Sequence, residues 1–212
     1  GLLYPGEFLP VVEFVALQGQ LGDWVMREAL RQLEIWAGEG RQLVLSINVG
    51  ADQLQAAGFV DSLRFMLAKH PSVKTAQLEL EILETAALHD LIQVASVMEA
   101  CQALGVSFSI DDFGTGYSSL TYLKQLQADT LKIDQSFVRD MLEDPEDLAI
   151  VDGIIGLASA FRRKVVAEGV ESVSHGRMLI QLGCDLAQGY GIARPMPAEA
   201  LPEWIKSWQH PA

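Results

Sequence analysis

Seven polar side chains lie at or near the ends of short β-rich runs, and their types suit metal and phosphate chemistry. They are Asn48, Glu81, Asp111, Asp112, Lys132, Glu168 and Gln188. Carboxylates gathered at one place repel one another, which raises their pKa values unless a cation relieves the repulsion. Oxygen ligands favour Mg²⁺, Mn²⁺ or Ca²⁺ over zinc or copper. The set therefore predicts a site for hard divalent cations, and two such cations bridged by one carboxylate are a recurrent arrangement for displacement at phosphorus.

Each of these residues also has a structural interpretation. Asn48 can simply end a strand, Glu81 beside Glu79 can belong to a solvated edge, and the pair at 111–112 can cap a turn. Lys132 and Glu168 are harder to explain in this way, because a charged residue inside an apolar strand is seldom buried without a partner. Their shared position at strand ends favours the functional interpretation.

Motifs of other enzyme classes are absent from the sequence. The four histidines have no metal-binding spacing, and no nucleophile elbow or phosphate-binding Gly-x-x-x-x-Gly-Lys loop occurs. Asp112-Phe113-Gly114 matches a kinase tripeptide, but no glycine-rich loop accompanies it. We therefore discard a kinase and do not expect a histidine metal site.

The polar positions sit within an alternation of predicted strands and helices. The strands are Gln42–Val49, Thr75–Leu83, Val106–Phe113, Thr130–Asp134, Lys164–Val170 and Asp185–Tyr190. The helices are Leu21–Ala37, Asp52–Lys69, Asp90–Leu104, Tyr117–Leu126, Pro145–Phe161, Ser174–Leu182 and Ala198–Trp208. Strands separated by helices predict parallel pairing through right-handed crossovers.

The faces of these strands favour a barrel over a doubly wound sheet. Leu78, Leu80 and Ile82 share one face of their strand, whereas Glu79 and Glu81 share the other. A strand buried on both faces reads instead as a continuous apolar run. Polar residues late in each strand match the rim at which (β/α) barrels build active sites. We expect an α/β protein with a (β/α)8 TIM-like barrel, one domain over residues 1–212, whose N-terminal strands are absent from the given chain.

Composition limits the partners. The net charge of −13 and the pI near 4.6 argue against binding to a nucleic-acid polymer, which needs clustered basic residues. No apolar stretch reaches the ~20 residues of a membrane span, and no signal-peptide pattern opens the chain. We expect a cytoplasmic domain without membrane contact of its own, in a parent protein that other domains can attach to a membrane.

Several segments resemble one known family. They are DDFGTGYSSL at 111–120, LKID at 131–134, SFV at 136–138, AEGVE at 167–171, GCDLAQGY at 183–190 and RPMP at 194–197. EILE at 81–84 and PGEFLP at 5–10 extend the match upstream. Together they resemble the EAL-type cyclic-di-GMP phosphodiesterase domain over essentially the whole chain.

The resemblance implies hydrolysis of cyclic di-GMP to linear pGpG with two Mg²⁺ or Mn²⁺ ions. It implies that Asn48, Glu81 and Asp111 hold one ion, and that Asp111, Asp112 and Glu168 hold or approach the second. It implies that Lys132 orients the attacking water and stabilises charge on the phosphate. Glu168 is also a candidate general base, and Asp112 counts among the catalytic residues. Support for the site is expected from Gln188, Glu84, Glu171 and Pro195.

The resemblance also implies a homodimer and leaves alternatives open. Glu84 is expected to brace the Asp112–Ser119 loop, which with the following helix forms the dimer contact in this family. Leu83 replaces the family's usual threonine, and the namesake Glu-Ala-Leu is expected shortly before the position that matches Gly1. The alternatives are a catalytically inactive cyclic-di-GMP sensor and a module that only dimerises.

Overall fold

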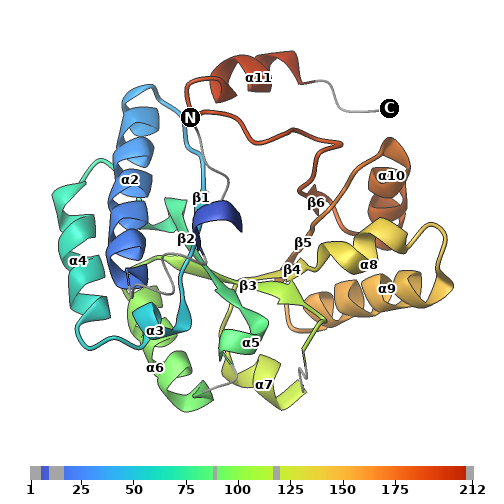
Figure 1. The fold of residues 1–212 in the computed structure, drawn as a ribbon, viewed down its shortest axis with the longest axis horizontal. Coiled ribbons are helices and arrows are strands. Elements are labelled where there is room, and N and C mark those ends of the chain that lie inside the picture. The colour runs from blue at the N-terminus through green and yellow to red at the C-terminus, as the bar shows by residue number, and fades with distance from the viewer. Residues whose placement is uncertain (1–5, 10–16, 88–89, 117–119, 209–212) are drawn as a thin grey trace. The chain divides into compact units, whose positions relative to one another are not determined.

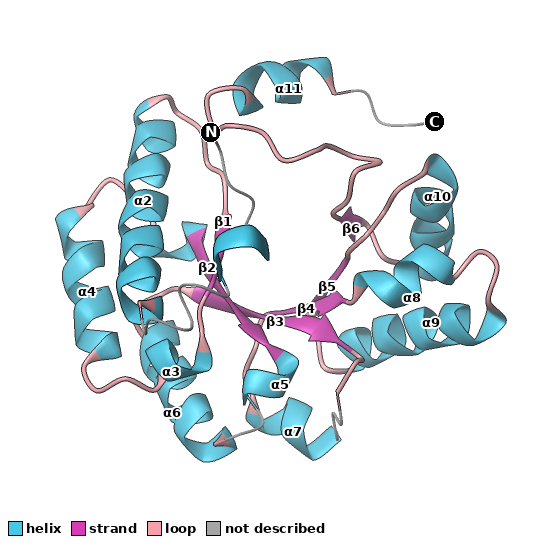
Figure 2. Ribbon diagram, in the orientation of Figure 1, coloured by secondary structure: helices cyan, strands magenta, loops and turns pink. Residues whose placement is uncertain are grey.

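The computed structural model describes residues 6–9, 17–87, 90–116 and 120–208. These residues form two compact units: Gly1–Ser109 with Thr121–Gln127, and Ile110–Leu120 with Ala128–Ala212. The division falls inside strand β3 (Ser107–Phe113), which therefore contributes to both units. The strands follow sequence order, β1-β2-β3 in the first unit and β3-β4-β5-β6 in the second (Figures 1 and 2).

The first unit is built on two paired strands and a long amphipathic helix. Its elements are α2 (Gln18–Gly38), β1 (Leu45–Asn48), α3 (Ala51–Leu54), α4 (Phe59–Lys69), η1 (Thr75–Gln77), β2 (Leu78–Leu83), α5 (Glu84–Ala87), α6 (Leu91–Gln102) and most of α7 (Leu120–Gln125). β1 and β2 are parallel, with Asn48 opposite Glu81. Met26, Leu30 and Leu33 are fully buried on one stripe of α2, which packs on β1, α3 and α4.

The second unit continues the parallel sheet and carries its own helices. Its elements after β3 are β4 (Thr130–Ile133), α8 (Gln135–Asp140), α9 (Pro145–Ala160), β5 (Lys164–Ala167), α10 (Val173–Leu182), β6 (Leu186–Ala187) and α11 (Leu201–Ser207). β5 pairs in parallel with β4 and with β6. The buried stripe of α9, which includes Val151, Ile154 and Ile155, packs on α8, β4 and β5.

Three predicted boundaries are wrong for local reasons. The predicted helix over 52–69 is two helices: the first ends at Leu54, and Gly58, with a left-handed φ of 87°, directly precedes the second, which begins at Phe59. The predicted strand over 75–83 begins only at Leu78, since Thr75–Gln77 form a 3₁₀ turn closed by a hydrogen bond from the Lys74 N–H to Gln77 Oε1. β6 is limited to two residues of the predicted 185–190.

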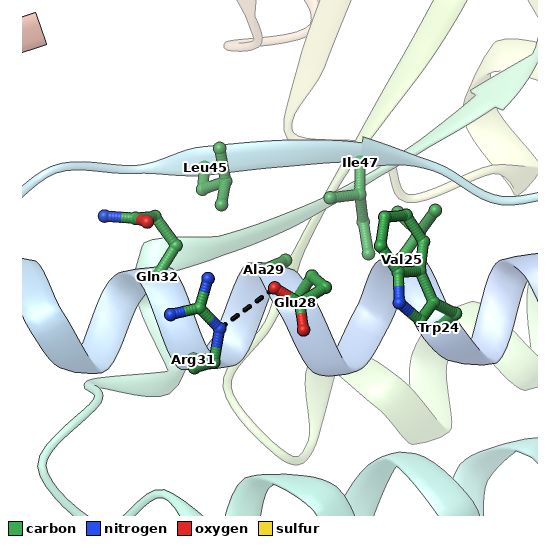
Figure 3. A pocket seen from close by; sticks show the side chains of 8 residues that line it. All are labelled: Trp24, Val25, Glu28, Ala29, Arg31, Gln32, Leu45 and Ile47. Carbon is green, nitrogen blue, oxygen red and sulfur yellow. Dashed lines mark hydrogen bonds and ion pairs between the residues drawn. The ribbon is translucent and has the colours of Figure 1, made fainter. Parts of the chain in front are cut away.

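A shallow groove lies between α2 and β1 in the first unit (Figure 3). Apolar side chains such as Trp24, Val25 and Ile47 line most of it, beside an exposed ion pair between Arg31 Nε and Glu28 Oε2 at 2.9 Å. None of the predicted site residues lines this groove. It therefore contributes nothing to the candidate site.

Across the part of the chain that the structure describes, no helix has the length and apolar character to cross a bilayer.

Candidate active site

Three of the predicted metal ligands meet in the second unit. Asp111 and Asp112 lie near the end of β3, and Glu168 directly follows β5. One ligand oxygen from each of the three carboxylates lies within 4.8 Å of the others. This spacing suits carboxylates that share a cation.

A buried lysine joins two of these carboxylates. Lys132, from the middle of β4, is only 5% exposed. Its Nζ lies 2.8 Å from Asp111 Oδ1 and 2.7 Å from Glu168 Oε1. The ammonium offsets part of the repulsion between the acidic groups. The buried charge of Lys132 is therefore paired with two carboxylates.

Two carboxyl groups of the cluster have raised pKa values. Burial, the charge of Asp111 and a hydrogen bond with Asp134 raise the pKa of Asp112 to about 6. Burial also raises the pKa of Glu168, although Lys132 acts in the opposite direction. Both carboxylates therefore hold protons more tightly than an isolated carboxylate does.

A fourth carboxylate, Asp134, belongs to the cluster and was missed as a site residue by the sequence analysis. Burial acts to raise its pKa, but hydrogen bonds from the Ser136 hydroxyl and backbone N–H outweigh this and lower it. Its Oδ1 accepts the Ser136 N–H at 2.9 Å and also the Ser136 hydroxyl, so Asp134 caps the N-terminus of α8 while it contacts Asp112. The signal available in the sequence was the Asp-x-Ser spacing of a helix cap.

The backbone at Asp112 is strained. Its φ is 53°, a left-handed conformation that residues other than glycine rarely adopt. The Thr115 hydroxyl donates to the Asp112 carbonyl at 2.9 Å and holds this turn. At Gly114, with φ of 104°, a Cβ would approach Phe137 and Ile154 to 3.0 Å. Strain of this kind is typical of functional turns, whose surroundings over-determine the conformation.

Gln188 is tied to the backbone next to Glu168. Its N–H donates to the Ala167 carbonyl at 2.8 Å, and its carbonyl accepts the Val170 N–H at 3.0 Å. The following residue must be glycine, because a Cβ at Gly189 would lie 2.3 Å from the Val170 carbonyl oxygen. The Gln188 residue itself is exposed.

Two further predicted support residues lie outside the acidic cluster. Glu171 is exposed, and its Oε1 lies 3.7 Å from Arg139 Nε of α8. Pro195 is exposed in the irregular segment between β6 and α11. Both residues therefore lie at the surface of the second unit.

The remaining predicted residues belong to the first unit. Asn48 is exposed at the end of β1, directly opposite Glu81, which is 8% exposed at the corresponding position of β2. One pleat earlier on the same faces, the Ser46 hydroxyl donates to Glu79 Oε1 at 2.8 Å. Glu84 is fully buried at the start of α5. The loop that Glu84 was expected to brace includes residues 117–119, which lie outside the described residues.

Comparison with known proteins gives the family of the chain. The sequence profile of the EAL domain matches residues 1–195. This chain belongs to the EAL domain family. The expected fold class, α/β of the TIM-like barrel type, is confirmed by the likeness of this EAL domain to solved EAL structures.

Two curated relatives and one solved structure illustrate the likeness. The EAL domain is 45% identical over 202 residues to the bifunctional diguanylate cyclase/cyclic di-GMP phosphodiesterase MucR of Pseudomonas aeruginosa, covering 95% of this chain and 29% of that protein. It is 40% identical over 213 residues to the cyclic di-GMP phosphodiesterase NbdA of the same organism, covering 100% of this chain and 27% of that protein. The structure of the MucR phosphodiesterase in complex with c-di-GMP has a TM-score of 0.90 and 44% identity, with 95% of this chain and 81% of that chain covered. The EAL domain therefore spans less than a third of the length of these curated relatives.

The donor set of this EAL domain fits a hard divalent cation. The three carboxylates within mutual reach offer only oxygen ligands, and the only clustered cation described beside them is the Lys132 ammonium. Repulsion and burial favour the protonated form of a carboxyl group and so raise its pKa. A bound cation can take the place of that proton and stabilise the ionised form.

Proposed function

We propose that this chain hydrolyses cyclic di-GMP to linear pGpG, with a site formed by Asp111, Asp112, Lys132 and Glu168. The observation that carries the proposal is the convergence of three carboxylates around one buried lysine, with Lys132 Nζ within 2.8 Å of two of them. Membership of the EAL family and the named activity of the relatives MucR and NbdA support the substrate. In the reaction, a water oxygen bonds to one phosphorus of the cyclic dinucleotide and the P–O3′ bond breaks.

The metal belongs to the proposal as well. We propose two Mg²⁺ or Mn²⁺ ions, held by carboxylates of the cluster together with Asn48 and Glu81, which the motif resemblance adds to the ligand set. When bound, such ions supply positive charge for the phosphate oxygens and lower the pKa of a coordinated water.

The chain's own residues perform the remaining tasks. Lys132 donates hydrogen bonds from a fixed position and can stabilise negative charge that develops on the phosphate. Glu168, whose Oε1 lies 2.7 Å from Lys132 Nζ, is the candidate to accept the proton of the attacking water. Asp134 and its Ser136 partner hold Asp112 in place. Gln188, Glu171, Glu84 and Pro195 are proposed as supporting residues.

The proposal is tested by incubating the full-length protein with cyclic di-GMP and Mg²⁺ or Mn²⁺. Linear pGpG should form with the wild type and not with Asp111→Asn, and a chelator should stop the reaction. Tight binding of cyclic di-GMP without turnover in both proteins would instead support a sensor. That alternative is not favoured, because all three predicted metal-ligating carboxylates of the second unit, Asp111, Asp112 and Glu168, are present in the cluster.

We also propose that the domain forms a homodimer through the Asp112–Ser119 loop and α7. Leu120, which begins α7, is 63% exposed and offers an apolar contact. Sedimentation of the full-length protein should detect dimers that Leu120→Arg weakens. An unchanged dimer in this variant would contradict the proposed surface.

A further inference from the structure

Helix α10 begins with an unusual form of a familiar cap. The hydroxyl of its N-cap residue, Ser172, accepts the His175 N–H at 3.2 Å. In an ordinary capping box, a glutamate or glutamine at the third helical position returns a hydrogen bond to the N-cap backbone. Here His175 holds that position, and its Nδ1 accepts the N–H of Glu171, one residue further back, at 3.3 Å. The box therefore contains a side chain that can take up a proton.

The hydrogen bond at Glu171 requires the neutral ring. An Nδ1 that accepts carries no hydrogen, so the imidazole proton must lie on Nε2. Protonation turns Nδ1 into a donor that faces another donor, and it places a cation at a helix N-terminus, where the helix dipole disfavours it. His175 is 8% exposed, so water replaces the lost contact poorly.

The residue at the other end of this loop is Glu168. The loop is held by backbone bonds from the Glu168 N–H to the Ile133 carbonyl at 3.1 Å and from the Val170 N–H to the Gln188 carbonyl at 3.0 Å. Gly169 has a φ of 72°, and a Cβ there would lie 2.6 Å from Gln135 Cβ, so the loop is pressed against the first turn of α8. The hydrogen bond from the Glu171 N–H differs from these two backbone bonds because its acceptor, His175 Nδ1, is a side-chain atom.

We propose that His175 is a positioning residue for Glu168: its neutral ring closes the cap of α10 and fixes the loop that carries the carboxylate to Lys132. The proposal rests on the function proposed above for its effect on turnover, but its structural part does not.

The test compares His175→Gln with His175→Leu in the full-length protein. Glutamine can accept the Glu171 N–H and does not titrate, whereas leucine fills the space without an acceptor. Hydrogen exchange of the segment 168–175 should become faster in His175→Leu and stay close to wild type in His175→Gln. At pH 8, kcat should fall about fivefold in His175→Leu, the equivalent of one ordinary hydrogen bond, with KM nearly unchanged. His175→Gln should keep the wild-type kcat.

The split between kcat and KM, with rescue by glutamine, separates a positioning role from a merely structural one. Loss of the acceptor should lower kcat at nearly unchanged KM in His175→Leu, and His175→Gln should restore kcat. His70→Leu is the matched control, since His70 Nδ1 contacts Glu34 in the first unit at 2.9 Å and its replacement should leave kcat and KM unchanged.

Two results overturn the proposal: wild-type exchange of 168–175 in His175→Leu, or a kcat for His175→Gln that is as low as that of His175→Leu. If the wild type does not hydrolyse cyclic di-GMP, the function proposed above fails, while the exchange experiment still decides whether His175 holds the loop.

Discussion

At the scale of single residues, the site is defined by an imbalance of charge. One ammonium, that of Lys132, contacts two of the three clustered carboxylates, and Asp134 adds a fourth acid. Burial, together with the neighbouring negative charges, raises the pKa values of Asp112 and Glu168. Because removal of one partner from a buried ion pair leaves the other charges uncompensated, Lys132 is the most sensitive position.

Replacing this lysine should harm both stability and catalysis. In metal-free protein at pH 8, Lys132→Met should lower the free energy of unfolding by about 3 kcal/mol, because Asp111 and Glu168 lose their buried counter-ion. Activity with metal should fall at least ~100-fold through loss of charge stabilisation at the phosphate. Denaturant unfolding and steady-state kinetics measure the two effects.

Lys206→Met is the control for this variant. Lys206 forms an ion pair of similar length with Glu203, 2.7 Å, but both side chains are largely exposed. Exposed pairs contribute under about 1 kcal/mol, so little should change. Equal losses in the two lysine variants would show that burial of Lys132 has no special effect.

Protons and metal should compete at Asp112. Since burial and neighbouring acids raise the pKa of this carboxyl to about 6, Asp112 stabilises the metal-free fold at low pH and loses that contribution as the pH rises through about 6. The pKa of Glu168 is raised too, so its contribution has the same sign. Metal binding needs the ionised forms, so its pH dependence has the opposite sign. The affinity for Mn²⁺, measured by calorimetry, should fall as the pH is lowered from 8 to 5.

Substitution of Asp112 should reduce this pH dependence. Asp112→Asn should bind Mn²⁺ more weakly at pH 8 and lose less affinity on acidification. Asp147 also has a raised pKa, through burial and neighbouring acids at the start of α9, and Asp147→Asn should keep the wild-type dependence. An unaltered pH dependence in Asp112→Asn would assign the competing proton to another group.

At the scale of elements, two helix caps of the second unit permit a matched comparison. Asp134 caps α8 by accepting the Ser136 N–H at 2.9 Å, and Asp144 caps α9 by accepting the Glu146 N–H at 2.8 Å. Each substitution by alanine should cost about 1 kcal/mol of stability, the usual value of an N-cap. Only Asp134→Ala should also reduce turnover, by more than ~10-fold, because only Asp134 contacts Asp112.

Thermal unfolding and kinetics on both variants measure this difference. If Asp144→Ala lost as much activity as Asp134→Ala, the effect would come from general destabilisation and not from the position of Asp134.

The elements also show why part of the site could be predicted from the sequence and part could not. The alternation of polar and apolar residues along the strands predicted that Lys132 lies on the polar face of its strand. Parallel pairing of the strands predicted that Asp111 and Glu168 lie near it, and both carboxylates contact its ammonium. Asp134 was missed because α8 has only six residues, too few for a helical period to be visible, so its cap went unnoticed. The hydrogen bond from the Glu171 N–H to His175 Nδ1 was missed because the usual capping-box pattern has glutamate or glutamine, not histidine, at the third helical position.

At the scale of the whole molecule, the chain has a net charge of −13. We expect divalent cations to stabilise its fold by binding at the proposed carboxylate site and not through this overall charge. A ligand that binds only the folded state stabilises it by RT ln(1 + [L]/Kd), which is about 2.7 kcal/mol at a concentration of 100 Kd. Mn²⁺ at this level should therefore raise the unfolding temperature of the domain by roughly 5–10 °C.

Scanning calorimetry of the full-length protein measures the shift, and the chelator EDTA should reverse it. Asp111→Asn should abolish most of the shift, because Asp111 belongs to the clustered carboxylates and contacts Lys132. Glu203→Gln changes the net charge by the same amount at an exposed position of α11, so it should retain the full shift. If both variants retained it, the cation would be acting on the overall negative charge, and the carboxylates between β3 and β5 would no longer account for metal binding.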